Sequence, residues 1–163
     1  MENKDVMIEK KDLTLEDLES LADKYIATFR TRIPDWNAFE DTQIEGFKRC
    51  QHRYIGAGAS GKHDDKNIIE AGAFTLSVMY VPPGQGAAAH THEVEEVFFM
   101  LEGHCVFFFE NEKGERVERN LGPLDCIWSP PDILHGFVNR SVEGCYLQAM
   151  LGKGKPKAYA AGV

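Results

Sequence analysis

The chain after Gly72 consists of short apolar or alternating segments separated by glycine, proline and asparagine. Segments of this kind are typical of the strands of an all-β domain, because side chains alternate between the two faces of a sheet and turn residues end each strand. The sequence Asn111-Glu112-Lys113-Gly114, between two such segments, has the composition of a hairpin turn. We expect strands at residues 74–81, 95–101, 105–110, 126–128, 136–139 and 145–151.

The first 70 residues follow a different pattern. Apolar residues recur at helical spacing over residues 15–29, and Thr14 stands before them as a predicted N-cap, so one amphipathic helix is expected there. Pro34 ends that pattern, and the stretch up to residue 70 shows no clear period. The glycine-rich segment 56–61 is interpreted as a flexible loop rather than a phosphate-binding loop, because no strand is predicted beside it.

These patterns divide the chain into three parts: an N-terminal helical and irregular extension (1–70), a β-barrel domain (71–151) and a C-terminal tail (152–163). With 163 residues, 43% of them apolar, the chain can form one hydrophobic core and is too short for two domains of typical size. The cysteines form no Cys-x-x-Cys pair, and we expect reduced core thiols rather than a redox or zinc motif. They are Cys50, Cys105, Cys126 and Cys145.

Charge and hydropathy restrict the partners. The chain has 18 Lys and Arg against 26 Asp and Glu, a formal charge of -8 that opposes binding to nucleic acid. The sequence contains no long apolar run, and its start, Met-Glu-Asn-Lys-Asp, does not resemble a signal peptide. We therefore expect a cytoplasmic protein that binds neither nucleic acid nor membranes and that forms a homodimer, since exposed strand edges need covering.

One group of side chains has the composition of a metal site. His90 and His92 are two residues apart, so on an extended strand both imidazoles lie on the same face. Glu96 keeps the same parity, and His135, from a later segment, is the candidate for a fourth ligand. The neighbouring Glu93 has the opposite parity and is not expected to be a ligand.

The remaining acidic and histidine residues near these motifs are assigned no role. Glu95, like Glu93, should face away from the site, and His52, His63 and His104 are interpreted as solvated side chains. A ligand set of imidazoles and one carboxylate suits a single divalent ion. Iron or manganese is favoured, with zinc, nickel, copper and cobalt as alternatives.

These residues resemble the first motif of the cupin family. The pattern Gly84-x5-His90-x-His92-x3-Glu96-x6-Gly103 matches that motif at every fixed position. The resemblance covers about residues 70–151. It implies a cupin jelly-roll β-barrel with an N-terminal helical extension, in which the residues matching the metal ligands are His90, His92, Glu96 and His135.

A second motif is similar with two departures. Pro130, His135 and Asn139 keep the spacing of the second cupin motif, while Leu124 and Asp132 stand where glycines are usual. The departures concern the shape of two turns and leave the predicted ligand, His135, in place.

Several aromatic or apolar residues are expected near the metal. Phe98 and Met100 share the parity of Glu96, and Phe137 shares that of His135, so these side chains should line the barrel interior. Tyr80 and Trp128 are candidates for orienting a substrate in an otherwise apolar pocket.

Three functions agree with this pattern. The leading hypothesis is a non-haem iron or manganese dioxygenase for a small oxygen-bearing organic substrate, in which Glu96 offsets part of the metal charge and can act as a catalytic base. The first alternative is a Lewis-acid isomerase, cyclase, lyase or decarboxylase. The second is a non-catalytic barrel that binds a small ligand.

Overall fold

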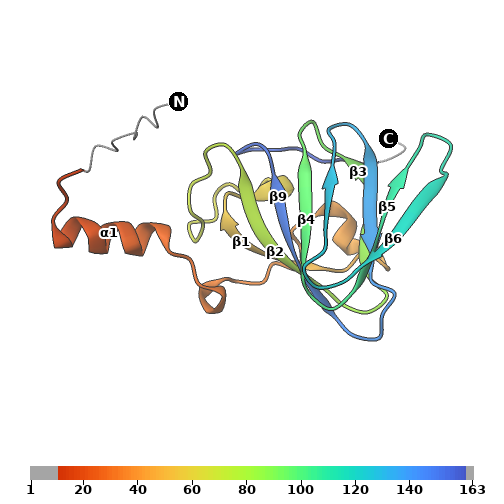
Figure 1. Cartoon of the computed structure of the whole chain (residues 1–163), viewed down its shortest axis with the longest axis horizontal. Helices are drawn as coiled ribbons and strands as arrows, with labels where there is room; N and C mark the ends of the chain where they lie inside the picture. The colour runs from red at the N-terminus through yellow and green to blue at the C-terminus, as the bar shows by residue number, and fades with distance from the viewer. Residues whose placement is uncertain (1–10, 161–163) are drawn as a thin grey trace, which may run out of the picture.

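The computed structural model describes residues 11–160, which form a β-barrel with one helix projecting away from it (Figure 1). Within these residues the strands form two five-stranded sheets, with the orders β1-β2-β9-β4-β7 and β10-β3-β8-β5-β6. All strand pairs are antiparallel. The strands are β1 (Cys50–Ile55), β2 (Thr75–Val81), β3 (Gly86–Thr91), β4 (Glu96–Glu102), β5 (Cys105–Glu110), β6 (Arg116–Leu121), β7 (Cys126–Ser129), β8 (Leu134–Val138), β9 (Cys145–Leu151) and β10 (Tyr159–Ala160).

The predicted all-β class is confirmed, and each of the six expected segments contains a strand. The other four strands, β1, β3, β6 and β10, were not among these segments. β6 is polar and almost wholly exposed at the edge of its sheet, and it is held by the hairpin with β5 that the turn at residues 111–114 predicted. β1 is also polar in sequence, and it is a strand because it pairs with β2 along its length.

The division of the chain into three parts differs from the structure at both boundaries. β1 comes from the stretch assigned to the N-terminal extension, yet it is an edge strand of the first sheet. β10 comes from the predicted C-terminal tail and pairs with β3 in the second sheet. The barrel therefore takes strands from both flanking segments. Residues 1–10 and 161–163, including the N-terminal start considered for a signal peptide, lie outside the described residues.

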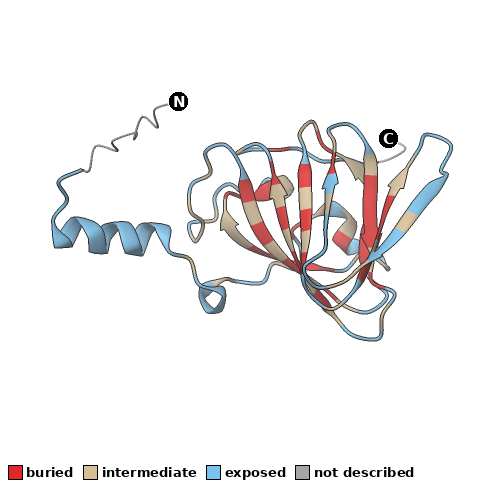
Figure 2. Ribbon diagram, in the orientation of Figure 1, coloured by how far each residue is buried: buried red, intermediate tan, exposed pale blue. Residues whose placement is uncertain are grey.

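The predicted N-terminal helix is present as α1 (Leu15–Tyr25). Thr14 caps it: the Thr14 hydroxyl accepts from the Asp17 amide, and the Asp17 carboxylate accepts from the Thr14 amide. The helix ends four residues earlier than expected, and Phe29 begins a separate 3-10 turn. No residue of α1 is buried, and Figure 2 shows the whole helix as exposed. No helix in the described part is long and apolar enough to span a membrane.

The inner face of the first sheet carries the core in transverse rows. In one row Ser77 of β2, Ala149 of β9 and Phe98 of β4 lie side by side in register. The next row, on the side away from Glu96, contains Met79, Leu147 and Met100, and all of these side chains are buried. The row on the other side contains Thr75, Leu151 and Glu96, so an acidic residue occupies an inward position beside the core.

Ion pairs fix the irregular N-terminal segment to the barrel. Arg53 of β1 contacts Asp35 at 2.7 Å and Asp65 at 2.8 Å. These contacts hold the pKa of both carboxyl groups below the usual range, although their partial burial acts in the opposite direction. The glycine-rich segment 56–61 is not a flexible loop, because Ala57 and Gly58 are buried against the barrel.

Two further expectations about single residues were wrong. His52 is 6% exposed, because β1 places it against the aromatic ring of Phe29 on the outside of the sheet. Cys126 is exposed. The other three cysteines are buried free thiols, as expected: Cys50, Cys105 and Cys145.

The two departures from the second cupin motif coincide with unusual backbone angles. Leu124 has a φ of 73° and Asp132 a φ of 62°, in the left-handed region that favours glycine. These are the two positions where glycine was expected, so the turns keep their shape although the residues differ. Leu124 is 78% exposed, and burial therefore gives little compensation for the strain.

Replacing Leu124 by glycine should stabilise the protein. A left-handed backbone costs a residue with a Cβ atom about 1–2 kcal/mol, and the flexibility of glycine in the unfolded chain offsets part of this gain. We expect Leu124→Gly to be more stable than Leu124→Ala by about 1 kcal/mol, as measured by urea denaturation. The alanine variant is the control, because it removes the side chain and keeps the Cβ atom; equal stability of the two variants would contradict the strain.

Candidate metal centre

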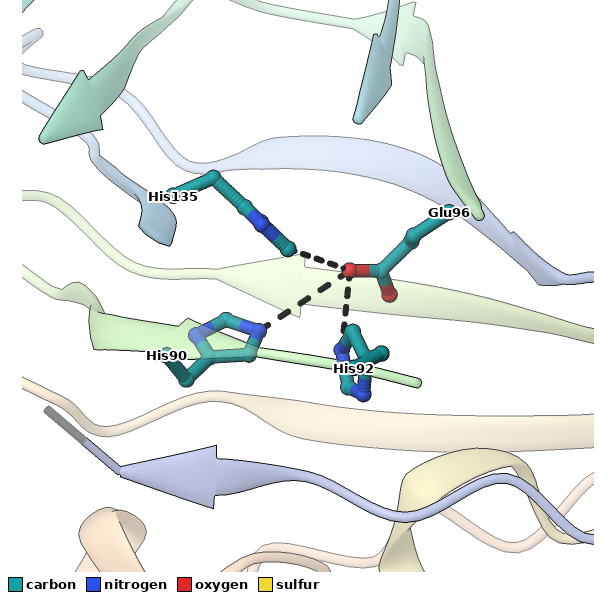
Figure 3. A group of neighbouring side chains, drawn as sticks. All are labelled: His90, His92, Glu96 and His135. Atoms are coloured by element: carbon teal, nitrogen blue, oxygen red, sulfur yellow. Dashed lines mark hydrogen bonds and ion pairs between the residues drawn. The ribbon is translucent and has the colours of Figure 1, made fainter. Parts of the chain in front are cut away.

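The four residues predicted as ligands lie together in the structure (Figure 3). Each offers one nitrogen or oxygen atom, and these atoms all lie within 4.8 Å of one another. Oε2 of Glu96 is 2.8 Å from Nε2 of His135, 3.1 Å from Nε2 of His92 and 3.8 Å from Nε2 of His90. The three imidazoles therefore face a single carboxylate oxygen.

Strand pairing brings these residues together from distant parts of the chain. His90 on β3 and His135 on β8 are direct partners across the second sheet, so their side chains are neighbours. His92 follows the end of β3, the chain then turns, and Glu96 opens β4 in the opposite sheet. The cluster thus joins the inner faces of the two sheets at one end of the barrel.

All three imidazoles are oriented in the same way by a backbone carbonyl. Nδ1 of His90 lies 2.7 Å from the Ala88 oxygen, and Nδ1 of His135 lies 2.8 Å from the Ile133 oxygen. Nδ1 of His92 lies 2.6 Å from the oxygen of Lys157, near the C-terminus. A carbonyl only accepts, so each Nδ1 carries a proton, and each Nε2 is the atom that would bind a metal ion in place of its contact with Glu96.

The electrostatics of the cluster agree with such an ion. Burial acts to raise the pKa of the fully buried Glu96 carboxyl, but the surrounding imidazoles outweigh it and hold that pKa well below its usual range. Burial likewise acts to lower the pKa of His92, and the carboxylate of Glu96 raises it overall. The site thus holds a charged carboxylate away from water, which is costly unless a cation balances it.

One buried nitrogen without a hydrogen-bond partner also agrees with a metal ion in this site. Nε2 of His92 is buried and has no hydrogen-bond partner, although it lies 3.1 Å from Glu96. Buried polar atoms are nearly always satisfied, and a metal ion held by the four side chains would satisfy this nitrogen. The four residues can therefore hold a metal ion, and imidazole with carboxylate fits a divalent transition metal.

The residues that were assigned no metal role lie outside the cluster. Glu93 accepts hydrogen bonds from the Lys157 amide, and Glu95 faces Gly152 at the end of β9. Neither belongs to the group of candidate ligands, as their parity predicted. His63 and His104 are exposed.

A cavity of about 270 Å³ lies beside the cluster. His90, His92 and Glu96 form part of its wall. Phe98 and Phe137 also line it, as predicted from their parity, and their rings pack edge to face at 5.3 Å. Small side chains leave the space open between these groups. They are Ala38, Ala59, Ala87, Ala88, Ala89, Ala149, Ala158 and Ala160.

Three residues assigned to the substrate pocket do not line this cavity. Met100 points inward but lies in the closed core, one row beyond Phe98. Tyr80 is on the outer face of β2, where its ring packs against Tyr146 at 5.0 Å. Trp128 is 56% exposed on the outer face of β7. The register, which the sequence does not show, decides these positions.

The cavity also has polar walls that sequence reasoning missed. Ser77, Gln51 and Arg49 line it, and all three are buried. Arg49 is held by Asp41 through two contacts of 3.0 Å and lies over the ring of Phe137, 6.0 Å from its centroid. Recognition of β1 would have indicated Gln51, because it pairs with the inward-facing Met79. No sequence signal indicated Arg49, which precedes the strand.

Comparison with known proteins agrees with this architecture. The family model described as "Cupin domain" matches residues 77–150. Peruvianin-I, a cysteine peptidase from Thevetia peruviana latex, superposes with a TM-score of 0.63 and 17% identity over 87% of this chain and 80% of that one. No curated protein sequence matches this chain.

Two oxalate decarboxylases are also similar. The enzyme from Lactobacillus farciminis, in a formate complex, has a TM-score of 0.57 and 15% identity over 80% of this chain and 34% of that one. The enzyme from Bacillus subtilis at pH 4.6 has a TM-score of 0.54 and 15% identity over 71% of this chain and 28% of that one. This chain matches only about a third of each decarboxylase, and at these identities the likeness concerns the fold alone.

Removal of one imidazole should abolish metal binding without unfolding the barrel. In His92→Ala the remaining side chains still contact one another, so we expect folded protein that retains little metal. Elemental analysis should find about one divalent ion per wild-type chain and close to none in the variant. The control is His104→Ala, an exposed histidine outside the cluster. Full metal retention by His92→Ala would refute the assignment.

Proposed function

Because the cupin family model matches residues 77–150, and the strands form the predicted jelly-roll barrel with an N-terminal helical extension, we propose that the protein is a metal-dependent dioxygenase for a small organic molecule. One observation supports this most strongly. Three imidazoles, each oriented through its Nδ1, face one buried carboxylate at the wall of a cavity that has both apolar and polar lining residues. This arrangement combines a metal site with a compartment for a substrate.

The ligand set favours iron or manganese. Four protein ligands leave open positions on an ion that prefers six, and mixed imidazole and carboxylate donors suit both metals. Zinc, nickel, copper and cobalt accept the same donors. A bound iron or manganese ion would supply the redox chemistry and an electrophilic centre for a substrate oxygen.

The residues of the chain have separate tasks in this proposal. His90, His92 and His135 hold the ion, and Glu96 balances part of its charge. In this proposal Glu96, the buried carboxylate of the cluster, also accepts a proton from a substrate hydroxyl. Beyond these ligands, Phe98 and the alanine side chains exclude water from the substrate.

The charges of the lining residues favour an uncharged substrate. Apart from histidines, Arg49 is the cationic residue among the described residues of the cavity wall, and Asp41 already occupies its guanidinium. A carboxylate substrate would have to displace that ion pair. We therefore propose a neutral molecule of about one ring, with a hydroxyl or keto oxygen toward the metal ligands and its apolar body against Phe98 and Phe137.

The charged residues that line the cavity also make a Lewis-acid isomerase or lyase the weaker alternative. Such reactions move protons and need an acid or base besides the metal ligands. Of the described acidic residues in the wall, Asp41 is paired with Arg49, and Glu40 is exposed at the surface. Every proton transfer of such a reaction would then depend on Glu96 alone.

The proposed reaction can be tested with protein purified without a chelating tag. We expect about one iron or manganese per chain, and oxygen uptake that depends on a neutral diketone, catechol or hydroxy-aromatic substrate. Zinc or nickel with turnover but no oxygen uptake would instead support the Lewis-acid enzyme. Saturable binding without turnover would support a ligand-binding barrel.

Filling the cavity should weaken substrate binding and leave the metal in place. Ala149 lies between Ser77 and Phe98 in the cavity wall, so a leucine there would occupy the space of the substrate. We expect the KM of Ala149→Leu to rise by about tenfold or more, equivalent to roughly 1.4 kcal/mol of lost binding. Steady-state oxygen uptake and metal analysis measure both effects.

The matched control is Gln148→Leu, at the adjacent position on the opposite face of β9. Its KM should stay close to that of the wild type. An unchanged KM in Ala149→Leu would show that the substrate binds elsewhere.

A further inference from the structure

The three imidazoles of the metal centre are oriented by carbonyls of very different origin. His90 and His135 each use the carbonyl two residues earlier in their own segment. His92 uses the carbonyl of Lys157, which is 65 residues further along the chain. The orientation of His92 therefore depends on a segment that joins the barrel only at the end of the chain.

This segment, residues 154–160, is here named the C-terminal strap. Its last two residues form β10, in which Ala160 pairs with His90 and Tyr159 with Thr91. The Lys157 amide donates to both carboxylate oxygens of Glu93, at 3.1 and 3.2 Å. The strap thus contacts the chain on both sides of His92.

Close backbone packing guides the strap to this position. A Cβ atom on Gly154 would lie 2.7 Å from the carbonyl oxygen of Gly72, so the chain passes directly against the backbone there. Pro156 is buried, whereas residues 157–160 are exposed. Few buried contacts and a two-residue strand indicate a segment that can detach while the barrel stays folded.

The strap also forms part of the cavity wall. Ala158 and Ala160 are among the lining residues of the cavity, and β10 pairs with the strand that carries His90. Detachment would therefore remove part of the cavity wall and the hydrogen-bond acceptor of a metal ligand at the same time.

We propose that the C-terminal strap is a positioning element of the metal centre, in which the Lys157 carbonyl orients His92 and the Glu93 carboxylate anchors the strap. This inference rests on the proposed metal site. An imidazole without an acceptor at Nδ1 can rotate or carry its proton on Nε2, and it is then a poorer ligand. Metal binding and docking of the strap consequently favour each other, since each stabilises the same orientation of His92.

Two variants test the proposal in different ways. Deletion of the chain from Gly154 onward removes the acceptor, and Glu93→Ala keeps the full chain but removes the anchor. Calorimetric titration of metal-free protein with Zn²⁺ should show weaker binding by about 10–100-fold for the deletion, the range for loss of a group that orients a metal ligand. For Glu93→Ala we expect a loss of about tenfold, at the lower end of that range.

The matched control is Lys153→Ala. Lys153 lies outside the strap and contacts the same carboxylate of Glu93 only through a 3.5 Å surface ion pair. Its Zn²⁺ affinity should equal that of the wild type. A weaker affinity in this variant as well would mean that the surface ion pair at Glu93, and not the bond to the Lys157 amide, affects the metal, and it would contradict the proposal.

A second readout separates orientation of His92 from general loosening. Proton–nitrogen correlation spectra of the histidine side chains can follow hydrogen exchange of each Nδ1–H. In the wild type all three should be protected, because each donates to a carbonyl. In both strap variants protection should be lost at His92 and retained at His90 and His135. Equal loss at all three would indicate a merely structural role and would overturn the proposal.

The outcomes distinguish this inference from the proposed function. If the wild type binds Zn²⁺ and the two variants bind it as tightly, the metal site stands and the strap has no positioning role. If the wild type binds no metal, the proposed function fails. The exchange of the three Nδ1–H groups in the metal-free protein then still decides whether the strap orients His92.

Discussion

The metal centre depends on one repeated interaction, the hydrogen bond from Nδ1 of a buried histidine to a backbone carbonyl. It occurs at His90, His92 and His135, and in each case it fixes the proton on the nitrogen that faces away from the cluster. The opposite nitrogens therefore all point to the same place, beside the carboxylate of Glu96. Of the three acceptors only Ala88 lies within a strand, so the orientation of the ligands depends on β3, on the segment before β8 and on the C-terminal strap.

A second constraint is that the buried charge of Glu96 must be compensated by the side chains around it. Glu96 occupies an inward position on β4, in the same transverse row as Leu151, where an apolar residue would otherwise complete the core. Three imidazoles stabilise its charge, and they are supplied by the opposite sheet and by the turn before β4. The buried charge that the metal site needs therefore costs stability at this end of the barrel. The other end, with Met100 and Leu147, is an ordinary apolar core.

Residues outside the recognisable motifs complete the site. The N-terminal segment contributes Arg49 and Gln51 to the cavity wall, and the C-terminal segment contributes Ala158 and the carbonyl of Lys157. Neither segment carries a pattern that relates it to the cluster, because their contacts join positions far apart in the chain. The cavity exists since alanines such as Ala149 stand where larger side chains would fill the barrel.

Strand alternation and the spacing of His90, His92 and Glu96 are local properties, so the sequence alone predicted the all-β class, the hairpin at Asn111 and these three clustered residues. His135 was identified through the second motif. The sequence did not reveal that β1 joins the sheet, that Tyr80 and Trp128 face outward, or that Lys157 contacts His92. The facing of Tyr80 and Trp128 depends on register, because a shift of one residue turns every side chain of a strand to the other face. The pairing of β1 and the contact of Lys157 join segments far apart in the chain, and they form only when the chain folds.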